Sequence, residues 1–178
     1  TTGVVSASAK GNIALKSTRG DLVVGHLATE EGLVYVASER SILGASDQNG
    51  PHIDVRSLAG SLTLAAAECI GVPGNPLAYA SSSATGIIVI AGADVSLTRL
   101  GGDLLIDQIV GQGKMVELNA PSGGIYGDLV AGAWVELNAQ GDVGQAYNPL
   151  RVASTEELFG QIGGSAYIET PEGYGTTL

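Results

Sequence analysis

Two glutamates occupy the same place in an internal repeat, and their type and spacing suit acid–base chemistry. The sequence Val-Glu-Leu-Asn-Ala occurs at residues 116–120 and again at 135–139, an offset of 19 residues. Cleavage of a glycosidic bond uses two carboxyl groups about 5–10 Å apart, and Glu117 and Glu136 would lie roughly 5 Å apart on neighbouring strands. No Lys, Arg or His accompanies the pair in the repeat, and the alternating pattern places both glutamates on a solvent-facing side. We therefore expect no catalytic residue and no enzymatic activity.

An Arg-Gly-Asp tripeptide at residues 19–21 has the composition of an integrin-binding motif. The equivalent residues 101–103 are Gly-Gly-Asp, so the Arg does not recur, whereas Gly-Asp precedes an aliphatic segment in both copies. We expect Asp21 and Asp103 to serve the turn before a strand rather than a receptor.

Metal, cofactor and disulfide chemistry have little support in the sequence. His26 and His52 are isolated, share no metal-ligand spacing and do not pair with Cys69. Cys69 is the only cysteine, so no intrachain disulfide can form, and we expect a packed or half-exposed thiol. The calcium-binding β-roll motif, the EF-hand loop and phosphate-binding glycine loops are all absent. The sequence therefore predicts no metal site and no cofactor.

Aromatic residues are few and are candidates for stacking on sugars. The chain has one Trp, one Phe and six Tyr. Trp134 replaces Ser61 at the equivalent repeat position and precedes Val135, which the alternation directs inward. Trp134 is therefore predicted to point outward and is the one residue that we single out as a surface contact.

Repeats organise the whole chain and supply the elements that position these residues. Residues 20–24 match 102–106 at an offset of 82, and residues 71–81 match 144–154 at an offset of 73. The difference of about nine residues points to extra residues in the first copy, at the turn-rich segment 47–51. The sequence thus predicts a single β-helical segment over 1–178, with superrepeats at about 6–82 and 88–154 and a third copy cut short after 164. Each superrepeat holds about four short units of roughly 19–22 residues.

The short units predict a right-handed parallel β-helix, an all-β solenoid of about nine coils. Apolar spacing of the helical kind never persists and Gly recurs every few residues, which excludes leucine-rich repeats. Short alternating segments separated by Gly, Ser, Asn and Asp are typical of stacked coils, and handedness follows the general preference of parallel crossovers. We expect Val116 to stack on Val135, the amides of Asn119 and Asn138 to form a ladder, and the Asn-Pro-Leu segments to be rigid corners.

The sequence resembles the repeat region of giant secreted bacterial adhesins of the filamentous haemagglutinin and leukotoxin-like class. Residues 141–144 (Gly-Asp-Val-Gly) run into 148–152 (Asn-Pro-Leu-Arg-Val), and a degenerate copy leads from Ile70-Gly71 into 75–77 (Asn-Pro-Leu). The recurring Gly-Asp-Leu openings add to the likeness, which spans nearly all of the chain. The resemblance implies secretion to the bacterial cell surface and a part in adhesion and virulence, with attachment to host cells, neighbouring bacteria or a matrix.

Composition narrows the partners further. The net charge is −10, from 18 acidic and 8 basic residues, which argues against nucleic acid because no basic cluster can neutralise phosphates. The apolar stretches are too short and too interrupted for membrane insertion. We expect a structural and adhesive filament segment whose partners are a host-cell or matrix surface, including carbohydrate, and flanking coils of a longer parent chain. Two alternatives remain at this point: a carbohydrate-active β-helix of the polysaccharide lyase or hydrolase kind, and a trimeric phage tail-spike segment.

Overall fold

The computed structural model describes residues 3–45, 53–55, 60–82, 84–113 and 115–171. Within these residues the chain forms fifteen β-strands and no helix. The described part of the chain therefore contains no helix that is long and apolar enough to cross a membrane. The strands are β1 (Val4–Ala9), β2 (Ile13–Ser17), β3 (Leu22–Thr29), β4 (Val34–Ser38), β5 (Ile42–Gly44), β6 (Ile53–Val55), β7 (Leu62–Ala66), β8 (Leu77–Ser81), β9 (Ile87–Ala91), β10 (Val95–Arg99), β11 (Leu104–Gly111), β12 (Met115–Ala120), β13 (Ile125–Ala139), β14 (Leu150–Ile162) and β15 (Ile168–Glu169).

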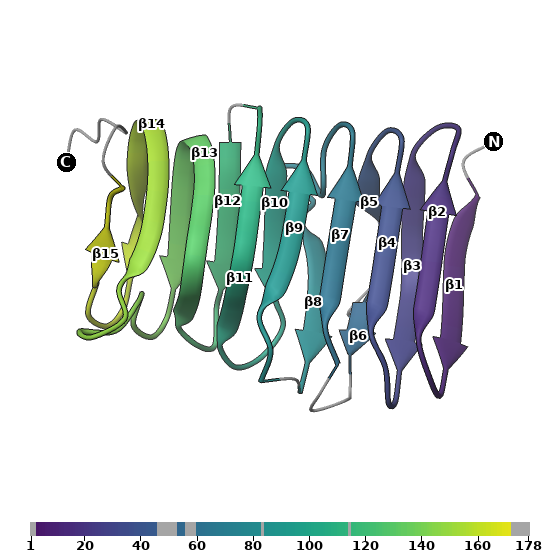
Figure 1. The fold of residues 1–178 in the computed structure, drawn as a ribbon, viewed down its shortest axis with the longest axis horizontal. Coiled ribbons are helices and arrows are strands. Elements are labelled where there is room, and N and C mark those ends of the chain that lie inside the picture. The colour runs from purple at the N-terminus through teal and green to yellow at the C-terminus, as the bar shows by residue number, and fades with distance from the viewer. Residues whose placement is uncertain (1–2, 46–52, 56–59, 83, 114, 172–178) are drawn as a thin grey trace.

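The strands wind into a flattened solenoid with two parallel faces (Figure 1). A first sheet contains β1, β3, β5, β6, β8, β10 and β12, and a second sheet contains β2, β4, β7, β9 and β11. The long strands β13 and β14 each pass from the second sheet to the first: residues 125–131 pair with β11, whereas residues 134–139 pair with β12. Every pairing between named strands is parallel in the described part of the chain, as a solenoid requires.

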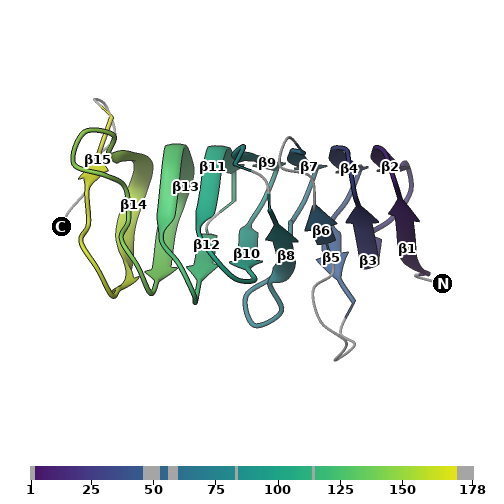
Figure 2. The same ribbon diagram turned by 90° about the horizontal axis from the view of Figure 1, so that it is seen from below.

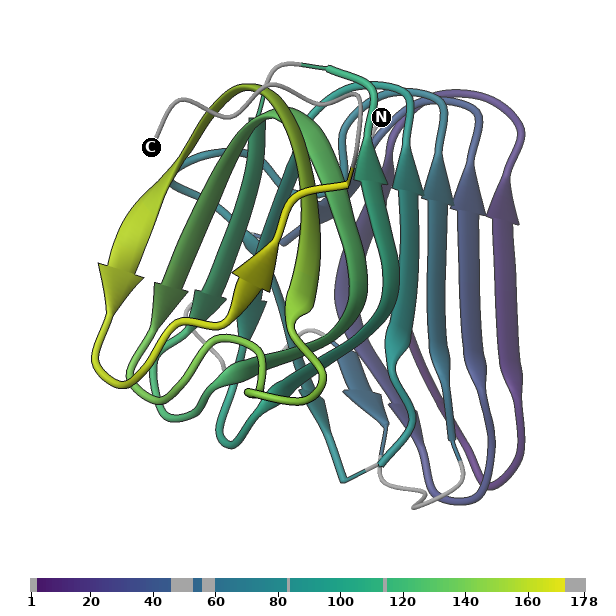
Figure 3. The same ribbon diagram turned by 60° about the vertical axis from the view of Figure 1, so that its left-hand side comes forward.

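The winding is right-handed, which confirms the predicted right-handed parallel β-helix. From the N-terminus to the C-terminus the chain climbs the near sheet and descends the far one while advancing along the rod (Figures 1 and 3). The solenoid has about seven turns rather than the nine predicted. Some turns are longer than the 19-residue offset suggested: Ile42 bridges to Ile70 and Ile70 to Val95, offsets of 28 and 25 residues.

Aligned aliphatic side chains fill the space between the sheets. In the second sheet one inward row runs through Val36, Leu64, Val89, Ile109, Val130 and Val152, each at most 1% exposed. In the first sheet the corresponding row includes Val116 directly beside Val135, both fully buried, which confirms the predicted stacking. Burial of each such side chain contributes about 1.5–3 kcal/mol, so the coils are held together mainly by this continuous core.

The long repeat relates the two sheets to one another. Residues 22–24 lie in β3 of the first sheet, whereas the matching residues 104–106 lie in β11 of the second. Residues 77–81 form β8 of the first sheet, and the matching residues 150–154 belong to the part of β14 that continues the second. Starting from β3, the chain passes β6, β8 and β10 in the first sheet and then crosses to β11 in the second sheet. The related segments therefore lie three and a half turns apart. The predicted extra segment at 47–51 lies outside the described residues.

Two tight loops stand out from the solenoid where the Asn-Pro-Leu corners were predicted. Val72 and Asn75 exchange backbone hydrogen bonds in the loop before β8, and Gln145 and Asn148 do the same before β14. Figure 2 shows the first loop, in teal, projecting from the first sheet. Each loop ends at the Asn of an Asn-Pro-Leu segment, and the buried strand that follows begins at the Leu of that segment. The Asn-Pro-Leu segments therefore form corners, as predicted.

Candidate functional site

Glu117 and Glu136 lie side by side on the outer face of the first sheet. Their Cα atoms are partners in adjacent strands β12 and β13. Ser96 donates its hydroxyl to Glu117 at 2.6 Å, and Asn119 donates its amide to the other oxygen of Glu117 at 3.0 Å. Asn138 donates in the same way to Glu136 at 2.9 Å. In the described part of the chain no basic side chain pairs with either carboxylate, and both glutamates are half-buried, so the geometry provides carboxylate acceptors held by neutral donors.

The predicted amide ladder is present. Asn138 donates through Nδ2 to Oδ1 of Asn119 at 3.0 Å. Oδ1 of Asn138 accepts the backbone N–H of Gln161 in the following coil at 3.1 Å. The ladder therefore joins three successive coils by hydrogen bonds on the outer face, which is a structural role.

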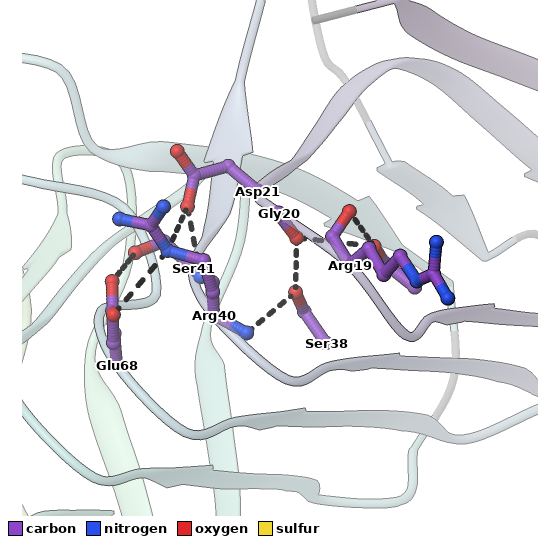
Figure 4. A network of polar contacts seen from close by, with 8 residues as sticks. Arg19, Gly20, Asp21, Ser38, Arg40, Ser41 and Glu68 are labelled. Atoms are coloured by element: carbon purple, nitrogen blue, oxygen red, sulfur yellow. Dashed lines mark hydrogen bonds and ion pairs between the residues drawn. The ribbon is translucent and has the colours of Figure 1, made fainter.

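The Arg-Gly-Asp segment is tied into the next coil (Figure 4). Oδ1 of Asp21 accepts the backbone N–H of Ser41 at 3.3 Å and lies 3.6 Å from Nε of Arg40. Arg40 also lies 3.4 Å from Glu68. In Figure 4 the Arg19 side chain extends away from the Asp21 carboxylate, which is held by Ser41 and Arg40.

Other aspartates that precede or follow a strand make the same bond between coils. Oδ1 of Asp103 accepts the N–H of Gly124 at 2.8 Å, and Oδ1 of Asp142 accepts the N–H of Ser165 at 2.7 Å. These two carboxylates also act on Tyr126, whose pKa is raised by burial first and by the two negative charges next. The recurring Gly-Asp pairs thus place a carboxylate where an N–H of the next coil would otherwise lack a partner.

The candidate metal and thiol residues do not come together. Cys69 is a half-buried free thiol, as expected, and the backbone N–H of His26 is bonded to the hydroxyl of Ser6. His52 lies outside the described residues. Within the described ranges no three His, Cys, Asp or Glu side chains are placed to hold a metal ion.

Trp134 points outward, as predicted, and stands at the edge of an open hollow. Its exposed fraction is 41%. The hollow has a volume of about 480 Å³ and is lined by Met115, Ala133, Trp134 and Glu156. Met115 is the strand partner of Trp134 in the preceding coil. An exposed indole beside a carboxylate offers a stacking surface and a hydrogen-bond acceptor at one place. Other exposed aromatic side chains are those of Tyr35, Tyr147, Phe159 and Tyr167, whereas Tyr174 lies outside the described residues.

A buried Arg–Tyr pair was missed by the sequence reasoning. Arg99 is 7% exposed and Tyr79 is 2% exposed, and the guanidinium carbon lies 5.3 Å from the centroid of the tyrosine ring. Burial raises the pKa of the Tyr79 hydroxyl above its ordinary value, and the charge of Arg99 acts in the opposite direction. A signal was available: Val95, Leu97 and Arg99 alternate inward along one strand, so the period places a charged residue in the core.

Comparisons with known proteins give no relative from which a function can be transferred. No family model matches the chain, and no curated protein and no solved structure matches it.

Proposed function

We propose that this chain is a structural and adhesive segment of an exported bacterial surface protein, a rod that holds a contact surface for carbohydrate on host cells or a matrix. The observation that carries the proposal is the hollow beside Trp134, where an exposed indole and the Glu156 carboxylate share one open surface. Pyranose rings present apolar C–H faces and hydroxyl rims, which suit an aromatic face and a carboxylate acceptor respectively.

The solenoid supports this role because it gives the contact a rigid base. Trp134 lies in β13, whose two halves belong to different sheets and pair with β11, β12 and β14. A side chain on such a strand is displaced little on binding, so little conformational entropy is lost. The likeness of the repeat to filamentous haemagglutinin-like adhesins agrees with the same role.

Fluorescence gives a direct test because Trp134 is the only tryptophan. Titration with soluble surface and matrix glycans should change the emission of Trp134, and beads coated with the protein should adhere to surfaces that carry the same glycan. Trp134→Ala should weaken binding at least about tenfold, as expected for a central aromatic contact.

Tyr35→Ala is the matched control. Tyr35 is 40% exposed, close to the value for Trp134, but it lies on β4 and does not line the hollow. The control should bind like the unchanged protein. Equal binding by Trp134→Ala would overturn the proposed contact, and release of shortened glycan during the titration would favour the carbohydrate-active alternative.

A further inference from the structure

A second hollow lies at the corner where the chain enters the second sheet. It has a volume of about 220 Å³, and four successive levels line it: the turn before β9, the starts of β11 and β13, and the loop before β14. Trp134 stands beyond the other end of the segment of β13 that pairs with β11. The two hollows share none of their described lining residues, so this corner is a separate surface of the rod.

A β-bulge turns Asp107 toward this hollow. Ile106 and Gln108 pair with consecutive residues of β9, so Asp107 between them is the extra residue of the bulge. Such bulges redirect a side chain and are frequent beside functional sites. A Cβ at Gly86 would overlap Oδ1 of Asp107, so the glycine leaves the room that the carboxylate occupies.

Three polar side chains line the hollow and keep their hydrogen-bonding groups available. They are the carboxylate of Asp107 and the carboxamides of Gln145 and Asn148. Within the part of the chain that the structure describes, none of these side chains makes a hydrogen bond or an ion pair. The backbones of Gln145 and Asn148 exchange two hydrogen bonds of 3.0 Å, so one tight loop holds both carboxamides.

An apolar surface lies beside these polar groups. Leu105 and Tyr126 are strand partners in β11 and β13, and both are half-buried where they line the hollow. Gly127 follows Tyr126 and adds no side chain there. The hollow thus combines apolar surface with a few convergent polar groups, which is the usual composition of a small-molecule site.

The polar groups determine which class of ligand fits. No described residue that lines the hollow is basic, and the net charge of the chain is −10, which disfavours phosphate, sulfate and carboxylate groups. An ammonium group only donates hydrogen bonds, so it would leave the carboxamide N–H groups without an acceptor. A hydroxyl group both donates and accepts, so neighbouring hydroxyl groups on a ring can satisfy a carboxylate and a carboxamide together.

We propose that this hollow binds one unit of a neutral glycan. The C–H face of the pyranose ring lies on Leu105 and Tyr126, and the hydroxyl groups bond to Asp107, Gln145 and Asn148. The volume is smaller than the roughly 300–1,000 Å³ of pockets for larger ligands, so it suits a single sugar unit whose neighbours extend into solvent. The site adds to the contact at Trp134 and does not depend on it.

Nuclear magnetic resonance of the isotope-labelled protein tests the proposal. Soluble hexasaccharides of glucose, of mannose and of N-acetylglucosamine are titrated one at a time. With at least one of them, the side-chain amide signals of Gln145 and Asn148 should shift saturably. Asp107→Ala should raise the dissociation constant at least about tenfold, because a hydrogen bond to a charged group is lost. Gln145→Ala should raise it about threefold to tenfold.

Asp128→Ala is the matched control. Asp128 belongs to the neighbouring strand, pairs with Arg151 and does not line the hollow, so its removal should leave the dissociation constant unchanged. Equal weakening by Asp107→Ala and Asp128→Ala, or no shift at Gln145 and Asn148 with any of the three glycans, would overturn the proposal. Shifts confined to the indole of Trp134 would overturn it as well and would leave the contact at Trp134 intact.

Discussion

At the scale of single residues, the sequence pattern located most of the side chains that shape the surface, but it did not reveal their partners. The alternation in Val-Glu-Leu-Asn-Ala correctly placed Val116 and Val135 inside, and it correctly predicted the stacked amides of Asn119 and Asn138. The bond from Ser96 to Glu117 could not be predicted, because it depends on the register between β10 and β12. The repeat pattern does not reveal Arg99, because a buried cation in one coil does not recur in the others.

Glycines in the loop before β8 give a residue-scale prediction. Gly71 has a φ of 63°, and a Cβ there would overlap the backbone oxygen of Ser96. Gly74 has a φ of 81° but faces open space. Gly71→Ala should therefore cost about 3–5 kcal/mol, whereas Gly74→Ala should cost about 1–2 kcal/mol, the left-handed backbone term alone. Urea unfolding measures both, and equal losses in the two variants would contradict the close approach at Gly71.

At the scale of elements, strand type was predictable and strand number per turn was not. Both sheets carry the same alternating pattern, so the sequence could not show that β3 and β11 lie in different sheets although they match in the long repeat. Units of 19–22 residues predict about nine coils, whereas the bridges from Ile42 to Ile70 and from Ile70 to Val95 span 28 and 25 residues, so fewer coils form. The Gly-Asp pairs were correctly assigned to turns, and the structure adds that their carboxylates bond to the next coil.

Asp142 tests these bonds between coils. Asp142→Ala removes the acceptor for the N–H of Ser165, so we expect a loss of about 1 kcal/mol, comparable to the loss of a helix cap. Asp142→Asn keeps an oxygen acceptor and should retain most of the stability. Asp128→Ala is the control, because Asp128 makes only an exposed ion pair with Arg151 and its removal should change the stability by less than about 0.5 kcal/mol. Thermal melts of the three variants provide the comparison. Equal losses of stability for Asp142→Ala and Asp128→Ala would show that the hydrogen bond from Ser165 to Asp142 does not stabilise the fold.

At the scale of the whole molecule, the account rests on a continuous parallel stack in which each coil supports its neighbours. In such a stack, residues about 20 positions apart in the sequence lie at neighbouring levels, one strand spacing from one another. The outward row of the second sheet shows this along most of the rod, through Ala14, Tyr35, Thr63, Ile88, Gln108, Leu129 and Arg151. The proposed contact at Trp134 depends on this register, because adjacent coils supply the residues that line its hollow.

The most direct test is therefore the distance between spin labels placed along that outward row, measured by pulsed electron paramagnetic resonance. In a Cys69→Ser background, labels at Ala14 and Gln108 are four levels apart, and labels at Ala14 and Arg151 are six levels apart. The stack predicts backbone separations of about 19 Å and about 29 Å, each with a narrow distribution. Equal separations for the two pairs, or broad distributions centred beyond about 40 Å, would contradict the parallel solenoid.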